Sequence, residues 1–448
     1  ADDVPARIPE AILRIFTICA PERKASRPAF ILSSMNNNIS KCLTGVLLCA
    51  SLIPGAASAD EDDVFSLTTS ANWQYVDNVF YLPDGNEPTS FGPNTPRGDH
   101  NTTLSAGIVG EKRLGRQVLT ANTTFNRTRY NDLSLLDNDG YNLAAGWRWA
   151  VGSDLSGNLS YSKRRYMLGF GDFRQVNLTK NLVDAETWRF DGTYKLDAYW
   201  ALFGSLNRDT QRNDAAVRRP NDYDIDRIEA GARYTTRGGT AFELLGRESR
   251  GDFPNRTATV LRDNAYKQKD AEFRVRWQPV GHSKLSASVG VSKREHDRAP
   301  TRDYDDLYGK FSWEWRPTGH LGLTFDVQRQ ISGLDDNFTT YFETETFSLT
   351  PVWYATGKVR VDGLLQYRSR DGQGRGNIDF IDPAVLAQFG DLAARRTEDI
   401  YTYSLGATWS IQRNLSASAQ WRHDRRDSNV NFYQYRTDSL SMSLQYLF

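Results

Sequence analysis

The residues best suited to acid–base chemistry are two histidines, His296 and His423, which are followed directly by Asp297 and Asp424. A histidine oriented by a carboxylate is the general base of many hydrolases. Both pairs lie at the ends of segments in which apolar and polar residues alternate, as they do in β-strands. Because neighbouring residues of a strand point to opposite faces, the two side chains of each pair cannot meet simply. The sequence therefore predicts no catalytic residue and no enzyme.

Metal, thiol and nucleic-acid chemistry have equally little support. The pair Asp335–Asp336 could bind a divalent cation, but solvated loop charge is the simpler interpretation. All three cysteines (Cys19, Cys42 and Cys49) precede a predicted cleavage site after residue 59, so the mature chain is expected to have no disulfide. Of the 55 basic and 55 acidic residues, six and four lie before residue 60, which leaves 49 and 51. We expect no metal, no cofactor and no nucleic-acid partner.

Arginines recur on the polar side of the alternating segments. Within 272–278, Phe273 and Trp277 point to one side of a strand, whereas Arg274 and Arg276 point to the other. If the polar faces of several strands surround water, these side chains tune which solutes pass. The residues predicted to line that interior are Arg148, Arg164, Arg189, Asp191, Arg227, Glu229, Arg233, Glu272, Arg274, Arg276, Glu314, Arg316, Arg360, Asp362, Arg368 and Arg422.

The connections between these segments alternate between short and long. Eight short turns are predicted, at 114–116, 152–154, 197–198, 237–239, 279–282, 317–320, 355–358 and 412–414. Nine longer connections lie between them, around 82–98, 131–139, 168–180, 210–222, 250–264, 296–303, 333–338, 371–394 and 426–431. Seventeen connections join eighteen strands, and an even strand count with short turns on one rim is typical of outer-membrane barrels. The predicted fold is all-β: a transmembrane, antiparallel, up-and-down β-barrel of about 18 strands.

The composition agrees with this fold class. Mean hydropathy is −0.58, aromatic residues make up 12% of the chain, and no run of about 18 apolar residues occurs. A membrane barrel tolerates low hydropathy because only alternate residues of each strand face lipid. The alternative is a soluble β-sandwich, which at this size would need several domains and linkers, and no linkers are visible.

Tryptophans precede many of the short turns. Trp149, Trp277, Trp315, Trp353 and Trp409 each lie two to four residues before one, and 277–282 closely resembles 315–320. This placement predicts an aromatic girdle at the periplasmic membrane interface. A β-propeller is the alternative, but its repeats would have a period of about 40–50 residues. The tryptophan motif recurs about every two strands, which favours the hairpins of one barrel.

The chain ends in an alternating segment, in which Leu440, Met442, Leu444, Tyr446 and Phe448 share one face. A terminal phenylalanine on such a strand resembles the closing strand that the outer-membrane assembly machinery recognises. An edge strand of a soluble sandwich is the alternative. We therefore predict that these five residues form an assembly signal and that this strand closes the barrel.

The front of the chain indicates export. Met35 opens a short polar segment, an apolar stretch follows from Leu43 to Ile53, and Ala57–Ala59 forms a small-residue cleavage site. We assign residues 35–59 to a signal peptide and 60–448 to the barrel. Residues 1–34 are interpreted as upstream sequence or an extended N-terminus. The predicted location is the bacterial outer membrane, with the barrel integral to it and in contact with its lipid.

The function of the lumen has two interpretations at this stage. Eighteen strands enclose an interior wide enough for an aqueous channel. Its charges could form a ladder in which neighbours on adjacent strands neutralise each other. They could instead form a net basic wall along which an anionic or neutral sugar polymer slides without deep binding.

The mature chain resembles the EpsL-type outer-membrane barrels encoded with exopolysaccharide biosynthesis genes in exosortase-linked (PEP-CTERM-associated) operons. The resemblance rests on the order and spacing of segments across nearly the whole mature chain. They are Tyr75–Phe80, Leu82–Gly85, Tyr141–Trp149, Asp222–Asp224, Arg250–Arg256, Arg276–Pro279, Arg294–Asp297, Trp315–Gly319 and Arg425–Ser428. It implies a channel that takes part in exopolysaccharide export, with the polysaccharide as transported substrate, and it implies no catalytic residue.

Two other functions remain open. A general diffusion porin for small hydrophilic solutes would fold one loop inward, and 371–394, with Phe380, Ile381 and Phe389, is a candidate for that loop. A structural barrel would instead anchor periplasmic polysaccharide export proteins through its short turns.

Overall fold

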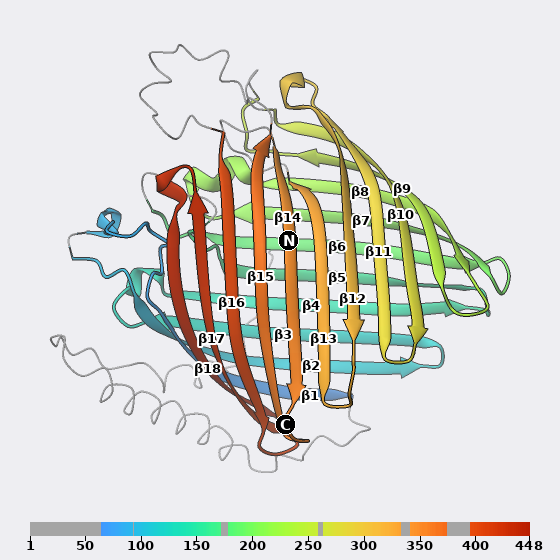
Figure 1. Cartoon of the computed structure of the whole chain (residues 1–448), viewed down its shortest axis with the longest axis horizontal. Coiled ribbons are helices and arrows are strands. Elements are labelled where there is room, and N and C mark those ends of the chain that lie inside the picture. The colour runs from blue at the N-terminus through green and yellow to red at the C-terminus, as the bar shows by residue number, and fades with distance from the viewer. Residues whose placement is uncertain (1–63, 93, 172–177, 259–262, 333–340, 374–394) are drawn as a thin grey trace, which may run out of the picture.

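The protein is described here by a computed structural model that covers residues 64–92, 94–171, 178–258, 263–332, 341–373 and 395–448. The described residues form a single sheet of 18 antiparallel strands that curls round and closes on itself (Figure 1). The predicted fold class and strand number are therefore confirmed. Residues 1–59, with the predicted signal peptide, and the pair Asp335–Asp336 lie outside the described residues, as do 374–394.

The strands are long, and short 3-10 helices occur only in the longer connections of the described chain. The strands are β1 Phe65–Val76, β2 Asp99–Leu114, β3 Gln117–Tyr130, β4 Asn138–Val151, β5 Leu155–Met167, β6 Leu182–Lys195, β7 Trp200–Asn213, β8 Tyr223–Thr235, β9 Ala241–Asp252, β10 Ala265–Val280, β11 Ser283–Glu295, β12 Tyr304–Trp315, β13 Leu321–Ser332, β14 Tyr341–Tyr354, β15 Val359–Gln373, β16 Thr397–Ser410, β17 Leu415–Ser428 and β18 Tyr435–Leu447. The 3-10 helices are η1 Thr89–Phe91, η2 Ser134–Leu136, η3 Ala216–Asn221, η4 Pro300–Arg302 and η7 Asn431–Tyr433. Across the described ranges, no helix is both long enough and apolar enough to span a membrane.

The ring closes where the last strand meets the first. Strand β18 pairs antiparallel with β1, from Thr68 opposite Leu447 to Val76 opposite Ser439. The backbone N–H of Phe448 then donates to the carbonyl of Leu67 at 2.8 Å, which extends the ladder by one step. Closure satisfies the backbone groups that a sheet edge would leave unpaired, and this is the condition for a sheet to cross a bilayer.

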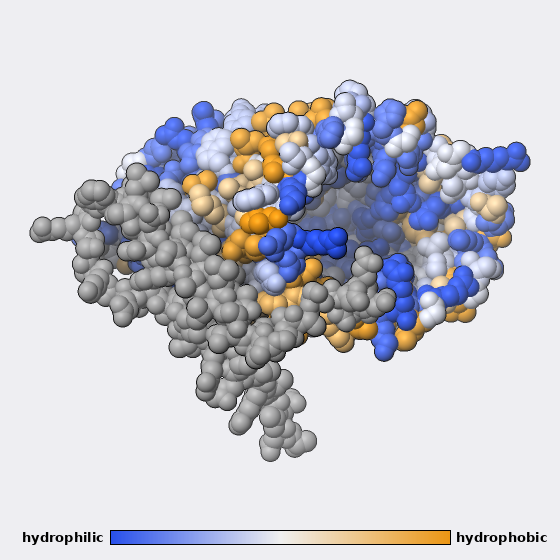
Figure 2. Space-filling model, turned by 90° about the horizontal axis from the view of Figure 1, so that it is seen from below, coloured by the Kyte–Doolittle hydropathy of each residue, from blue (hydrophilic) through white to orange (hydrophobic). Residues whose placement is uncertain are grey.

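Strand alternation gives the barrel two chemically different faces. Register partners share a face, so Phe190, Leu206 and Ile228, which lie opposite one another on β6, β7 and β8, form one continuous apolar row. These side chains and others such as Leu244 and Trp277 are exposed. Viewed from below, the molecule is hollowed and the visible walls of the hollow are mostly hydrophilic (Figure 2). The apolar rows therefore face outward, where lipid covers them.

Side-chain oxygens stabilise several short turns. The carboxylate of Asp197 accepts the backbone N–H groups of Tyr199 and Trp200 at 2.7 and 2.8 Å between β6 and β7. Thr318 and Thr356 do the same with their hydroxyls in the β12–β13 and β14–β15 turns. Such local hydrogen bonds give the backbone an alternative to the ladder, so they favour reversal of the chain at these positions.

One outward-facing glycine provides space for an aromatic stack. Trp149 lies parallel to Phe190, with ring centroids 5.8 Å apart, across the strand that carries Gly157. A Cβ atom at Gly157 would lie 2.0 Å from the carbonyl oxygen of Asp191 and 2.5 Å from the Trp149 ring. Neither neighbour can move without breaking the β5–β6 ladder or the stack.

We therefore expect Gly157→Val to destabilise the barrel by about 1–3 kcal/mol, the usual cost of overpacking. The measurement is the temperature at which the purified protein changes from its fast-migrating folded band to its slow-migrating unfolded band on a gel. Gly281→Val is the matched control, because a Cβ atom there meets nothing within 4 Å. Equal transition temperatures for the two variants would contradict the prediction.

Candidate functional site: the inward face of the barrel

The sequence-predicted lining residues all lie on the polar face or next to it. Arg316 lies in the β12–β13 connection, where its backbone N–H donates to the carbonyl of His282 at 2.8 Å. By their strand positions and register partners, the others lie on the face opposite the apolar rows: Arg148, Arg164, Arg189, Asp191, Arg227, Glu229, Arg233, Glu272, Arg274, Arg276, Glu314, Arg360, Asp362, Arg368 and Arg422.

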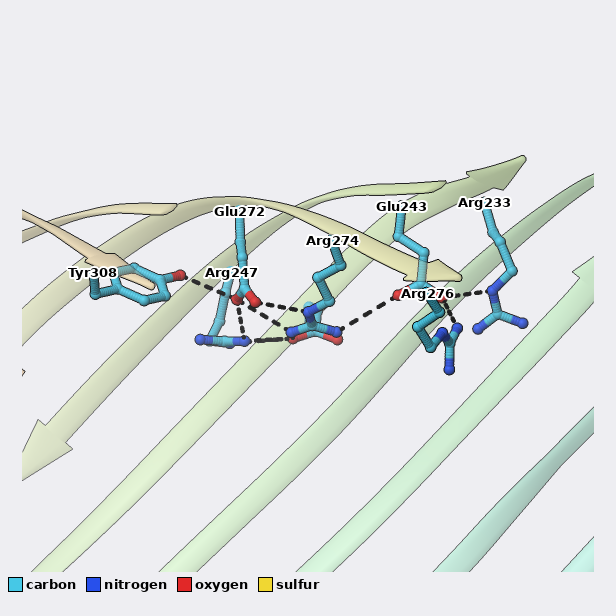
Figure 3. A network of polar contacts seen from close by, with 8 residues as sticks. Arg233, Glu243, Arg247, Glu272, Arg274, Arg276 and Tyr308 are labelled. Carbon is cyan, nitrogen blue, oxygen red and sulfur yellow. Dashed lines mark hydrogen bonds and ion pairs between the residues drawn. The ribbon is translucent and has the colours of Figure 1, made fainter. Parts of the chain in front are cut away.

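A continuous ion-pair network covers the inward face of β8, β9 and β10 (Figure 3). At its centre, Arg247 contacts Glu229 at 2.9 Å, Glu272 at 3.4 Å and Asp270 at 3.6 Å. Arg274 contacts Glu272 at 2.8 Å and Glu229 at 3.7 Å. Each guanidinium therefore bridges two or more carboxylates, and each carboxylate named here except Asp270 serves both guanidinium groups.

The network extends to both sides of this centre. Glu243 accepts a hydrogen bond from Arg233 at 2.6 Å and also pairs with Arg276. On the other side, the hydroxyl of Tyr308 on β12 donates to Glu272 at 3.1 Å. Four arginines (Arg233, Arg247, Arg274 and Arg276) face four carboxylates (Glu229, Glu243, Asp270 and Glu272), so this part of the lumen wall is formally neutral.

Sequence reasoning missed four members of this network: Glu243, Arg247, Asp270 and Tyr308. In 241–252 the polar face of β9 carries Leu245 between Glu243 and Arg247, which blurs the alternation. The pairing of Arg247 with Asp270 depends on the β9–β10 register, in which the two residues are direct partners. Register is set by turns and packing across strands, so this pairing could not be assigned from either strand alone.

In this network the carboxylate side chains are more buried than the arginine side chains that they pair with. The Arg276 side chain is 56% exposed, whereas that of its partner Glu243 is 5% exposed. For Arg274 and Glu272 the values are 31% and 7%. Carboxylates have short side chains that stay against the wall, while the longer arginine side chains carry their charge toward the lumen axis. The network is formally neutral, but the groups that a solute in the lumen meets are mainly guanidinium cations.

The same asymmetry continues around the lumen. In each inward ion pair of the described chain the cation is the more exposed partner, as with Arg422 and Asp424 (47% and 13%) or Lys310 and Asp326 (53% and 26%). Outward pairs are mixed: Arg212 is more exposed than Asp224 (40% and 21%), whereas Arg129 is less exposed than Asp139 (27% and 68%). Both sequence interpretations, the charge ladder and the basic wall, thus describe part of the arrangement.

Three long connections pack together at the rim opposite the short turns. Phe80 is fully buried, with its ring centroid 5.0 Å from those of both Phe91 and Phe170, so the β1–β2 and β5–β6 connections pack together. Leu133 and Leu136 of the β3–β4 connection complete this apolar cluster. We call it the mouth cluster.

The mouth cluster also contacts β17 and β18, the last two strands, which adjoin β1 in the ring. Arg426, on the inward face of β17, donates to the carbonyl of Gly171 at 2.9 Å, and Tyr81 packs edge-on against Tyr435 of β18 at 4.9 Å. Tyr81 has a φ of 55°, which is uncommon for a residue with a side chain. The sequence singled out 371–394 as the inward loop; its residues 374–394 lie outside the described residues.

The histidines contact aspartates other than their sequence neighbours. Nδ1 of His296 lies 3.2 Å from Asp303, in the β11–β12 connection, and Nδ1 of His423 lies 3.0 Å from Asp438 on β18. Burial lowers the pKa of His296 below its usual value, and the hydrogen bond to Asp303 partly offsets this effect. Within the described ranges, no group of three or more His, Cys, Asp or Glu residues is arranged to hold a metal ion.

The aromatic and C-terminal residues singled out from the sequence lie on the outward face. Trp277, Trp315, Trp353 and Trp409 are exposed near the short-turn ends of β10, β12, β14 and β16, and Trp149 lies near that of β4. Leu440, Met442, Leu444 and Tyr446 share the outward face of β18, and the Phe448 ring contacts Tyr446 at 4.5 Å.

A closed barrel of 18 strands with apolar outward rows and a polar, hollow interior defines an integral outer-membrane β-barrel channel. No protein family and no curated protein matches the chain. Solved structures are similar at the level of the whole chain. One is Pseudomonas aeruginosa OccK2 (OpdF) in complex with glucuronate, at 13% identity and a TM-score of 0.46 over 88% of this chain and 99% of that one.

Two further solved structures are similar to a comparable degree. The outer membrane protein opdK from Pseudomonas aeruginosa is 12% identical, with a TM-score of 0.44 over 86% of this chain and 98% of that one. A BenF-like porin from Pseudomonas fluorescens Pf-5 is 13% identical, with a TM-score of 0.43 over 87% and 99%. At this level of similarity, the neighbours do not indicate a substrate for this chain.

Proposed function

We propose that this barrel is a passive channel for small hydrophilic solutes and that it favours anions. The observation that carries the proposal is the exposure asymmetry of the lumen wall, in which guanidinium groups such as that of Arg276 face the pathway while carboxylates such as Glu243 are covered. A guanidinium binds a carboxylate or phosphate through two parallel hydrogen bonds. Anionic solutes therefore find successive partners along the wall.

The arginines of the lumen wall are suited to passing an anion along the channel, and they are poorly suited to holding it at one position. Each arginine already shares its hydrogen bonds with carboxylates of the wall, as Arg274 does with Glu272 and Glu229. A passing anion competes with these internal partners and gains little from any single one. Weak binding at several successive positions is the condition for conduction.

Solute uptake into proteoliposomes tests this proposal. We expect a hexuronate to enter several-fold faster than the neutral hexose of the same size, because the two solutes differ only in charge at the arginine-lined wall. Swelling rates at low and high salt provide the measurement, and the difference should shrink as salt screens the wall. Equal rates for both sugars at low salt would contradict anion preference, and no swelling with either would contradict a passive channel.

The resemblance to EpsL-type barrels supports a second proposal, in which the transported solute is an exopolysaccharide and periplasmic export proteins deliver it to the short-turn rim. A wall of exposed guanidinium groups suits an acidic polymer as well as small anions. The C-terminal strand would in both cases be recognised by the outer-membrane assembly machinery.

Deletion of the gene separates the two proposals. If the barrel conducts a polymer, deletion should abolish surface polysaccharide, raise periplasmic carbohydrate and leave the uptake of small sugars unchanged. If the barrel is a porin, deletion should slow the uptake of small anionic solutes and leave surface polysaccharide intact.

A further inference from the structure

Five neighbouring strands of the ring, β18 and β1 to β4, present an uncharged face to the lumen. On β1, β3 and β18 no inward residue is acidic or basic, and the same holds from 101 to 109 on β2 and from 138 to 146 on β4. Serine, threonine, asparagine and glutamine predominate there. Two adjacent rows of register partners show the pattern: Asn72, Thr103 and Thr128, and then Ser70, Ser105 and Asn126. We call this surface the uncharged wall.

Charged groups border the uncharged wall on all sides. Asp99 of β2 ends it at the rim of the long connections, where the carboxylate accepts backbone N–H groups of the β3–β4 connection. At the short-turn rim, Arg113 and Glu111 pair with each other at 2.9 Å. On the neighbouring strands, Arg164 of β5 and Arg422 of β17 face the lumen. Between these limits a solute meets mainly hydroxyl and amide groups, and no charge.

Three amide side chains of the uncharged wall can bind a solute. Asn72, Asn126 and Asn142 are all at least partly exposed, and within the described ranges none of their side-chain amides has a hydrogen-bond partner. Each amide offers two donors and one acceptor oxygen. Some nearby hydroxyls are used within the wall, since Thr103 and Thr128 share a hydrogen bond of 2.8 Å. The free amides therefore suit solutes that carry hydroxyl groups, which donate and accept in the same way.

The uncharged wall lies across the lumen from the arginine network. Half of the 18-strand ring separates β1 from β10, so β18, β1 and β2 face β9, β10 and β11. The network on β8, β9 and β10 presents guanidinium groups such as that of Arg276 to the pathway (Figure 3). A solute in the lumen therefore has cations on one side and uncharged hydrogen-bonding groups on the other.

We propose that the channel selects anions that also carry many hydroxyl groups, namely sugar acids, whose carboxylate meets the guanidinium groups while their hydroxyls meet Asn72, Asn126 and Asn142. This inference rests on the proposed function, because the lumen must first favour anions, and it narrows the class of solute. A simple anion such as acetate gains only from the arginines, and a neutral sugar gains only from the amides. A sugar acid gains from both, and weak attraction at both walls raises its concentration in the lumen and so its flux.

Uptake into proteoliposomes tests the inference, with the acidic disaccharide lactobionate and its neutral counterpart lactitol as probes. The test variant is Asn72→Val/Asn126→Val/Asn142→Val. The matched control is Asn72→Thr/Asn126→Thr/Asn142→Thr, because valine and threonine have similar shapes and differ in the hydroxyl group. We expect the valine variant to take up lactobionate roughly fivefold more slowly than the wild type, which is the effect of about one net hydrogen bond. The threonine variant should stay close to the wild type.

Acetate, which carries charge but no hydroxyl group, separates this inference from the proposed function. Its uptake should be the same in the wild type and both variants. Equal uptake of lactobionate by the valine and threonine variants would overturn the inference. An equal loss of acetate and lactobionate uptake in the valine variant would also overturn it, because the substitutions would then have narrowed the pore. Heat-dependent gel migration verifies that each variant is folded.

The wild type alone tests the proposed function in the same preparation. Lactobionate should enter it faster than lactitol at low salt, and chloride should permeate more readily than potassium. If the wild type prefers chloride and the valine and threonine variants still behave alike, the proposed function holds and only the choice of sugar acids fails. If the wild type shows no preference for chloride or for lactobionate, both fail.

Discussion

Replacing Arg233, Arg274 and Arg276 with glutamine should reverse the charge selectivity of the channel. The three guanidinium groups are among those that reach furthest from the β8–β10 wall, and the carboxylates of Glu243 and Glu272 lie behind them. Without the arginines, the same wall presents uncompensated negative charge to the lumen. We expect the permeability ratio of chloride to potassium to fall by about an order of magnitude, from above one to below one.

The reversal potential of a planar bilayer under a salt gradient measures this ratio directly. The sign of the potential should change between the wild type and the triple variant. Lys163→Gln/Arg165→Gln/Arg212→Gln serves as the control, because it removes three cations from outward ion pairs and should leave the sign unchanged. An unchanged sign in the lumen variant would show that another part of the pathway sets selectivity.

Loss of a partner from a buried ion pair also costs stability, commonly about 3–5 kcal/mol. The single variant Arg276→Gln avoids most of this cost, because Arg276 is the most exposed member of the network and Glu243 keeps its contact with Arg233. A smaller shift of the reversal potential in the same direction is expected from it. If both variants shift the reversal potential in the same direction, the shift reflects the lost lumen charge and is not a result of misfolding.

Phe80→Ala should release the mouth cluster and widen the channel. The Phe80 ring is fully buried between Phe91 and Phe170, and its removal leaves a cavity that costs about 3–5 kcal/mol. Because the cluster joins connections rather than strands, this cost falls on loop packing and leaves the ladder intact. We expect higher and noisier single-channel conductance and faster proteolysis within 77–98, with no loss of the folded gel band.

Phe347→Ala is the control for this experiment. The Phe347 side chain is exposed on the outward face of β14, so its removal leaves no internal cavity. Its conductance should equal that of the wild type. Wild-type conductance in Phe80→Ala would mean that the mouth cluster does not limit the pathway.

The order of the strands and the direction of their faces were predictable from local sequence. Alternation in 272–278 assigned Arg274 to one face and Trp277 to the other, and the short turns marked the rim. Both signals are local, because a strand's two faces follow from backbone geometry and a turn depends on a few residues. Turn residues such as Asp197 then act within their own segment, and the structure places them where the pattern indicated.

The contacts between charges were not predictable in the same way. Lys269 and Lys293 look like separate surface lysines in the sequence, and only the β10–β11 register makes them direct neighbours. Similarly, nothing near Glu243 indicates that it is buried under Arg233 and Arg276. Registers depend on the packing of whole strands and on closure of the ring, which no single segment contains.

The sequence by itself determined that the chain forms a barrel and how many strands it has, because period-2 alternation and turn chemistry act over a few residues. The same alternation predicted many of the inward charges, but it missed Glu243, Arg247 and Asp270. The tertiary structure decided which of those inward charges reaches the solute. That outcome depends on side-chain length and on the register between neighbouring strands, which together place carboxylates against the wall and guanidinium groups toward the axis. On the outside, the same register sets Lys267 opposite Glu295 and Lys269 opposite Glu248.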